Sequence, residues 1–250
     1  MSLAVPPATA ATDIAELAKG GRTNFFGFLL RLAARLPFLF IAGRLYGTEN
    51  LGRFASAVVA VEIAAQIATL GQKRGLAQLL QRGDRPAACI VADGLFVTLG
   101  ISLVLAAVLW TIPVVLFPSG GVDPLERLLP LVIFPLAAGD IALAALAFRY
   151  DVATTVRARS VVEPWVLSIA AGGLFFVIPQ TGMVVAYFLA ITAAMLVALV
   201  ALVKSYGLPR GWQPHPLILG HQALTNLPIA GADLVETATR KIDKIGRAHV

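Results

Sequence analysis

Long apolar runs, each separated from the next by a short stretch of polar or charged residues, occupy most of this chain. A helix needs about 20 mostly apolar residues to cross the hydrocarbon core of a bilayer, and the runs reach or approach this length. The pattern therefore predicts an all-α polytopic membrane protein with about six complete transmembrane helices and the start of a seventh. The predicted spans are residues 25–45, 54–71, 88–117, 128–148, 162–178 and 183–203, followed by a seventh from about residue 217.

The same pattern divides the chain into four parts. Residues 1–22 form a predicted cytoplasmic N-terminal segment, residues 23–210 a six-helix bundle, and residues 211–244 the start of a second bundle. Residues 245–250 read IGRAHV, which is what one frame of a common sequencing adapter encodes, so we expect them to be foreign to the protein. We also expect the natural reading frame to continue, because the seventh helix would otherwise stop unfinished.

Composition favours a membrane protein over a soluble one. Hydrophobic residues make up 58% of the chain, charged residues make up 14%, and the mean hydropathy is +0.82. Soluble domains carry about 25% charged residues. The formal net charge of +6 does not indicate nucleic acid, because the basic residues sort by membrane side. Cys89 is the only cysteine and the three histidines are scattered, so we expect no disulfide, metal site or cofactor.

Basic residues cluster in alternate loops. They concentrate in the N-terminal segment and in the stretches 73–85, 149–159 and 204–210, whereas the loops between these stretches hold few. Cytoplasmic loops of membrane proteins carry an excess of Lys and Arg, so we expect the N-terminus and the richer loops to lie in the cytoplasm. The opposite loops are very short, which leaves no room for an extracytoplasmic catalytic domain before residue 204.

Two arginines lie inside the first predicted span, which reads FFGFLLRLAARLPFLFIAGRLY. Arg31 and Arg35 are one helical turn apart and therefore share a face of the helix. A charge in hydrocarbon costs roughly 3 kcal/mol or more. We therefore expect both side chains to face a wet cavity, a partner carboxylate or an anionic ligand.

Other ionisable residues also fall within the apolar runs. Glu62 and Gln66 share one face of the second span, and Asp140 lies about two turns from the cytoplasmic end of the fourth. Asp93 lies near the cytoplasmic end of the third span, where we expect water to solvate it. Two interpretations of Arg31 stay open, namely a role facing the cavity or a structural ion pair with Glu62 or Asp140.

The seventh segment is amphipathic rather than uniformly apolar. Asn226, Asp233, Thr237 and Arg240 form one polar stripe along it, and Pro228 is expected to kink the helix near its start. Such a helix within a bundle is expected to line an aqueous cavity. The alternative is a helix that lies flat at the membrane surface.

Residues 18–80 resemble the opening of the oligosaccharide flippases of the MOP superfamily, the group of polysaccharide-biosynthesis or O-antigen translocases. A basic, Gly-containing stretch precedes the first helix, and a short turn with the sequence LYGTENLGRF follows it at residues 45–54. The second helix then ends in Leu70-Gly71 before a basic loop. Further along the chain, Asn226-Leu227-Pro228 and Arg240-Lys241-Ile242-Asp243 resemble the seventh helix of these proteins.

The resemblance implies a fold of about twelve to fourteen helices in two bundles around a central cavity. It also implies a transport function without reaction chemistry, in which a polyprenyl-diphosphate-linked oligosaccharide is moved outward across the bacterial inner membrane by alternating access. The expected partners are this lipid-linked oligosaccharide, membrane lipids and other polysaccharide-assembly proteins, with no nucleic acid. The expected cavity residues are Arg31, Arg35, Glu62, Asp140, Asp233 and Arg240.

Two other functions remain open on the sequence. One is a cation-coupled multidrug exporter of the same superfamily, which would use acidic cavity groups and is supported by Glu62 and Asp140. The other is a membrane enzyme of polysaccharide polymerisation. That class normally needs a large outer loop with polar catalytic groups, and the short outer loops before residue 204 do not provide one.

Overall fold

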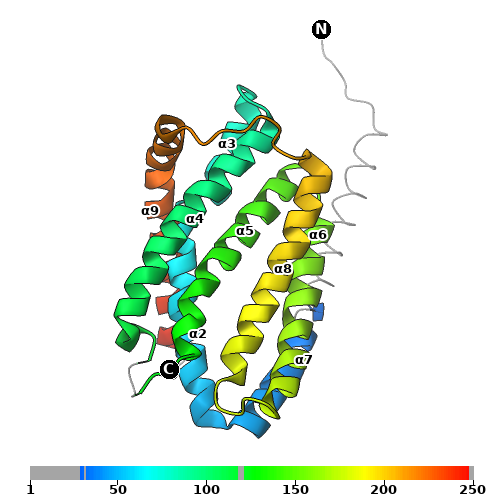
Figure 1. The fold of residues 1–250 in the computed structure, drawn as a ribbon, viewed down its shortest axis with the longest axis vertical. Helices are drawn as coiled ribbons and strands as arrows, with labels where there is room; N and C mark the ends of the chain where they lie inside the picture. The colour runs from blue at the N-terminus through cyan, green and yellow to red at the C-terminus, as the bar shows by residue number, and fades with distance from the viewer. Residues whose placement is uncertain (1–28, 31, 118–120, 248–250) are drawn as a thin grey trace.

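The computed structural model describes residues 29–30, 32–117 and 121–247, and it describes the side chains of these residues except for 221 and 233–247. Every regular element in this part of the chain is helical, and the part described contains no strand (Figure 1). The all-α prediction is therefore confirmed. Four helical stretches of the described residues are long and apolar enough to cross a membrane, namely Thr48–Arg82, Ala87–Thr111, Glu126–Phe148 and Gly182–Tyr206.

The expected span at 162–178 overlaps the end of a continuous helical stretch that contains a π-helical turn. Helix α6 (Val152–Val156) is followed by a π-helical turn, η4 (Arg157–Val162), and then by α7 (Glu163–Phe175). The three pieces follow one another without a break over residues 152–175, and this stretch is not among the four membrane-crossing candidates. The expected first span lies partly outside the described residues, and its described part is helical over 32–41 before the turn η1 (Ala42–Tyr46).

The stretch Thr48–Arg82 consists of two helices, α2 (Thr48–Ala68) and α3 (Gln72–Arg82). Between them Leu70 and Gly71 both have positive φ values, of 46° and 65°. Glycine adopts this left-handed conformation without steric penalty, whereas a side chain such as that of Leu70 makes it costly. The chain therefore changes direction at Gly71, and α3 presents its side chains differently from a simple continuation of α2.

The ends of the other long helices follow from local sequence. Helix α4 (Ala87–Thr111) ends at Ile112, because the residue before a proline is excluded from the helical conformation and Pro113 follows. A 3-10 segment, η3 (Glu126–Val132), leads into α5 (Ile133–Phe148), and α8 (Gly182–Tyr206) ends at Gly207 with φ of 77°.

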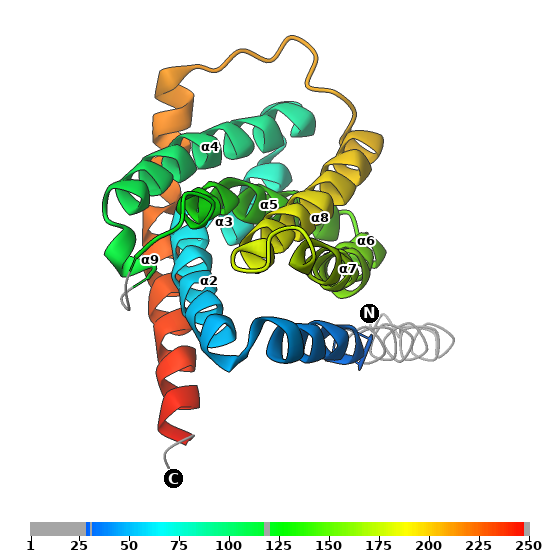
Figure 2. The ribbon, with the colours of Figure 1, turned by 60° about the horizontal axis from the view of Figure 1, so that its bottom comes forward.

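Helix α5 lies at the centre of the bundle and packs against α2, α3, α4 and α8 (Figures 1 and 2). Its inward positions are mostly small, and Ala137, Ala138, Ala142 and Ala145 are completely buried. Small residues allow helix backbones to approach closely, which is how helices associate where lipid removes the hydrophobic driving force. Asp140 is therefore carried by the most enclosed helix of the bundle.

Helix α9 (Pro216–Arg247) packs against α3 and α4 and continues through Pro228. It crosses the joint between α2 and α3 at very close range. A Cβ atom added at Gly71 would lie 2.6 Å from the backbone nitrogen of Ala230, and one added at Gly75 would lie 1.9 Å from Oδ1 of Asn226. The two glycines therefore make the close approach of α9 possible.

Candidate functional site

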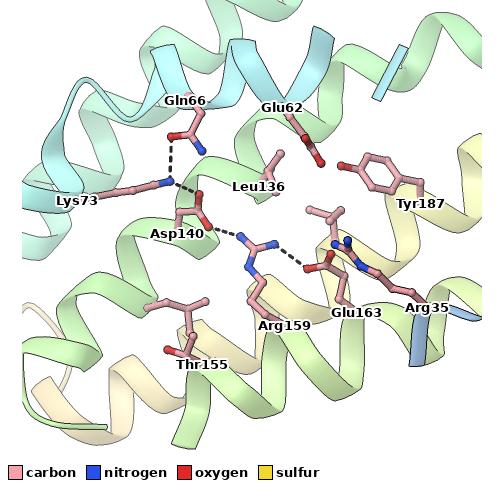
Figure 3. Close-up of a pocket in the computed structure, with 12 residues that line it drawn as sticks. Arg35, Glu62, Gln66, Lys73, Leu136, Asp140, Thr155, Arg159, Glu163 and Tyr187 are labelled. Carbon is pink, nitrogen blue, oxygen red and sulfur yellow. Dashed lines mark hydrogen bonds and ion pairs between the residues drawn. The ribbon is translucent and has the colours of Figure 1, made fainter. Parts of the chain in front are cut away.

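A polar cavity of about 430 Å³ opens among α2, α3, α5, α7 and α8 (Figure 3). This volume lies within the range of about 300–1,000 Å³ that is typical of ligand pockets. The charged and polar lining residues are Arg35, Glu62, Gln66, Lys73, Asp140, Thr155, Arg159, Glu163 and Tyr187, and Leu136, Leu143 and Ile191 complete the wall.

A chain of ion pairs crosses the cavity with Asp140 at its centre. Lys73 Nζ lies 2.5 Å from Asp140 Oδ2, and it also donates a hydrogen bond to Gln66 Oε1 at 3.1 Å. Arg159 donates to the other carboxylate oxygen of Asp140 and reaches Glu163 Oε2 at 2.8 Å. Asp140 is therefore the shared counter-ion of two cations that come from different parts of the chain (Figure 3).

These charges are largely withdrawn from solvent. The side chain of Arg159 is 14% exposed and that of Asp140 is 19% exposed. Burial alone would lower the pKa of Arg159, but the carboxylates of Asp140 and Glu163 raise it above its ordinary value. Arg159 is thus a permanent cation, and it is suited to binding negative charge rather than to transferring a proton.

The position of Arg159 depends on an unusual local structure. Arg159 lies in the π-helical turn η4, and Glu163, which it contacts, is the first residue of α7. π-helical turns are rare within α-helices and occur frequently at functional sites. This wider turn changes which side chains of the segment face α5, and it brings Arg159 to Asp140.

Arg35 differs from the other cations of the cavity. Its side chain lines the cavity and is exposed, and it makes no hydrogen bond or ion pair with another residue that the structure describes. Lys73 and Arg159, by contrast, are each held by a carboxylate. Arg35 is therefore the cation most readily available to a negatively charged ligand.

The structure brings together three of the six cavity residues predicted from the sequence, namely Arg35, Glu62 and Asp140. Arg31 lies outside the described residues. Asp233 and Arg240 belong to α9, but their side chains are not among those described. The prediction for these three residues therefore stays a prediction.

The sequence analysis missed Lys73, Arg159 and Glu163 as cavity residues. Lys73 and Arg159 fall in the basic loops, where positive charge was taken only as a topology signal. A local signal existed for Arg159 and Glu163, because Arg159 precedes Glu163 at the spacing of one helical turn, which places a cation beside a carboxylate. Helical spacing does not relate Lys73 to Gln66, because the turn at Leu70 and Gly71 separates α3 from α2.

The expectation that Asp93 is solvated is wrong. Asp93 is 1% exposed, and both of its carboxylate oxygens accept hydrogen bonds, one from Arg85 at 2.5 Å and one from Trp212 Nε1 at 2.7 Å. The ring of Trp212 also packs edge-on against Phe96. Asp93 therefore connects α4 to the segment between α8 and α9. The position of Asp93 in the sequence did not reveal this contact, because Trp212 lies 119 residues further along the chain.

Groups of three or more His, Cys, Asp and Glu side chains able to hold a metal ion do not occur among the described residues. The arrangement of the cavity is one of fixed, paired charges around an open space. Comparison of the chain with protein-family models, curated proteins and solved structures found no match.

Proposed function

We propose that the protein translocates a polyprenyl-diphosphate-linked oligosaccharide across the bacterial inner membrane. The observation that supports this most directly is the charged cavity, which carries Arg35, Lys73 and Arg159 among helices apolar enough to cross a membrane. A cation within such a bundle is expensive unless it meets water or negative charge. The diphosphate of a lipid-linked sugar would supply that charge.

The pairing within the cavity suits an anionic ligand that enters and leaves. Asp140 divides its two oxygens between Lys73 and Arg159, so Lys73 shares its carboxylate, while Arg159 also has the carboxylate of Glu163. Arg35 has no described partner. Charge-assisted hydrogen bonds from such groups contribute roughly 1.5–3 kcal/mol each. A diphosphate could therefore gain contacts with Arg35 first and then compete with Asp140 for the other two cations.

The proposal includes the wider arrangement in the membrane. We propose that six helices cross the membrane before α9, which is the seventh, and that the N-terminus lies in the cytoplasm. We also propose that α9 forms a wall of the cavity through Asp233 and Arg240. The lipid-linked oligosaccharide, the surrounding lipids and other polysaccharide-assembly proteins would be the partners. The protein would act as a transporter and not as an enzyme.

A cation-coupled multidrug exporter is the second candidate. Glu62, Asp140 and Glu163 place three carboxylates in the cavity, as many as there are lining cations. Carboxylates are the groups that would bind a cationic drug or a coupling ion. The two functions are distinguished by which charges matter, because an exporter would lose activity with Glu62→Gln and a flippase with Arg35→Ala.

We expect Arg35→Ala to abolish export of surface polysaccharide while protein levels stay near normal. Arg35 has no described partner whose loss would destabilise the fold, so the change should remove ligand contact alone. Arg35→Lys should retain part of the activity, because lysine keeps the charge but loses the two-pronged hydrogen bonding of the guanidinium. The assay is surface polysaccharide in a deletion strain that expresses each variant.

Arg44→Ala is the matched control for this experiment. Arg44 lies in η1, directly after the helix that carries Arg35, and it is exposed and does not line the cavity. Export should be unchanged in this variant. Normal export by Arg35→Ala, or an equal loss in both variants, would contradict a role for Arg35 in binding the substrate.

The predicted orientation can be tested with single cysteines. Asp84 and Asp123 are both exposed and lie in turns that the proposed topology puts on opposite sides of the membrane. In a background with Cys89→Ala, an impermeant thiol reagent applied to whole cells should label a cysteine at position 123 and spare one at position 84. The opposite labelling pattern would show that the orientation is the reverse of the one proposed. Permeabilised cells provide the control that both cysteines react.

A further inference from the structure

A second, smaller cavity of about 120 Å³ lies between α3, α4 and α9, apart from the site described above. It opens beside the turn that joins two membrane-crossing candidates, Thr48–Arg82 and Ala87–Thr111. Such a turn lies at the membrane surface whichever way the protein is oriented. The cavity is below the size of typical ligand pockets, about 300–1,000 Å³, and suits a small headgroup better than a whole ligand.

Four charged residues line this cavity, and two of them neutralise each other. Asp93 is fully engaged by Arg85 and by Trp212. The remaining pair is Arg82 and Asp84, which are exposed and make no hydrogen bond or ion pair with another described residue. The cavity therefore offers one positive group and one negative group that have no described partner and are separated in the sequence by Gly83 alone.

A third polar group in the cavity also lacks a partner. Gln222 on α9 is only 6% exposed, and its Nε2 makes no hydrogen bond among the described residues. A buried amide donor without a partner costs free energy, and it is normally satisfied by water or a ligand. Gln222 lines the cavity together with Arg82, so a negatively charged oxygen held there would receive donors from both residues.

The apolar lining has the character of a lipid contact. Leu79 on α3, Ile90 on α4 and Ile218 on α9 complete the wall. Ile218 is 38% exposed. Charged pockets between membrane helices at the surface of the bilayer bind lipid headgroups of complementary charge.

We propose that this cavity binds a zwitterionic phospholipid whose headgroup carries a primary ammonium, as in phosphatidylethanolamine. Arg82 and Gln222 hold the phosphate, Asp84 holds the ammonium, and Leu79, Ile90 and Ile218 contact the start of the acyl chains. A purely anionic lipid would leave Asp84 beside a negative headgroup, which disfavours it. The site is separate from the transport cavity and does not depend on what that cavity carries.

The test is native mass spectrometry of the whole chain in mild detergent with phosphatidylethanolamine, phosphatidylglycerol or phosphatidylcholine of identical acyl chains. We expect the ethanolamine lipid to be retained best. Phosphatidylcholine should bind more weakly, because its quaternary ammonium cannot donate a hydrogen bond to Asp84. Phosphatidylglycerol bound as well as, or better than, phosphatidylethanolamine would overturn the proposal, and this comparison needs no variant protein.

Single substitutions then test which residues form the lipid site. Arg82→Gln and Gln222→Leu should each reduce retention of the ethanolamine lipid about tenfold, since each removes a contact to a charged group. Asp84→Asn should abolish the preference over phosphatidylglycerol. Arg157→Gln is the matched control, because Arg157 is exposed and lines neither cavity, and it should have no effect. Equal losses in Arg82→Gln and Arg157→Gln would indicate general attraction of lipid to positive charge and would overturn the site.

A last comparison separates a lipid from a soluble ligand. Phosphoethanolamine and inorganic phosphate, added at the concentration of the lipid, should leave the bound lipid in place, because neither contacts Leu79, Ile90 and Ile218. Displacement of the lipid by either soluble compound would show that the cavity recognises free phosphate chemistry, and the lipid proposal would then be wrong.

Discussion

Asp140→Asn should lower the free energy of unfolding by about 2–3 kcal/mol. The change keeps the shape of the side chain but leaves Lys73 without its described carboxylate partner and Arg159 with Glu163 alone. Breaking a fully buried ion pair costs about 3–5 kcal/mol and an exposed pair about 0–1 kcal/mol. The side chain of Asp140 is 19% exposed, which places the expected cost between these limits. Unfolding by SDS in mixed micelles, followed by far-ultraviolet circular dichroism, measures it.

Two further variants show whether the loss comes from the cations. Lys73→Met combined with Asp140→Asn should recover part of the stability, because the cation left without a described carboxylate partner is removed, whereas Arg159 keeps Glu163. Asp84→Asn removes an exposed carboxylate that has no ion pair with a described residue, and it should leave stability nearly unchanged. A double variant no more stable than Asp140→Asn alone would mean that Lys73 and Asp140 are not energetically coupled.

Gly71→Ala should detach α9 from the joint between α2 and α3. The added methyl group would lie 2.6 Å from the backbone nitrogen of Ala230 and 3.0 Å from the backbone oxygen of Asn226, and backbone atoms cannot rotate away as a side chain can. The residue also has φ of 65°, which an alanine adopts at a cost of about 1–2 kcal/mol. Overpacking adds a further 1–3 kcal/mol, roughly. A disulfide engineered between α3 and α9 should therefore form much less in this variant.

Gly83→Ala separates the effect of backbone strain from the effect of the collision with α9. Gly83 has φ of 68°, almost the same as Gly71, but nothing lies within 4 Å of the position where its Cβ would be. It therefore carries the backbone strain without the collision, and the α3–α9 disulfide should form normally. If both variants lose the disulfide equally, the close approach of α9 is not what Gly71 provides.

Residues that line the cavity could be picked out from the sequence where the signal was local, and their role in binding a substrate stays a prediction. Glu62 and Asp140 were identified because a charge within an apolar run stands out, and both line the cavity in the structure. Arg35 was found for the same reason. The helical character of the chain likewise follows from long apolar runs, which the four membrane-crossing candidates reflect.

The predictions failed where a residue depends on distant contacts. Arg159 reaches Asp140 from the π-helical turn η4, and no pattern of apolar residues encodes that geometry. Lys73 joins the cavity because the chain turns at Gly71 before α3 begins. Asp93 is buried by Trp212, which belongs to a segment far along the chain. A positive charge in a loop thus either marks a cytoplasmic loop or belongs to the cavity, and the sequence alone does not separate these two possibilities.

The sharing of Asp140 between two cations has a kinetic consequence for any anion that enters the cavity. A new contact with Lys73 or Arg159 competes with the existing ones to Asp140 and Glu163, so the net gain on binding should be smaller than the contacts themselves suggest. Asp140 stays within reach and can take the cation back. A ligand held in this way has a short residence time, because the carboxylate that it displaces promotes its dissociation. Rapid release, rather than tight capture, is the property that this arrangement of charges favours.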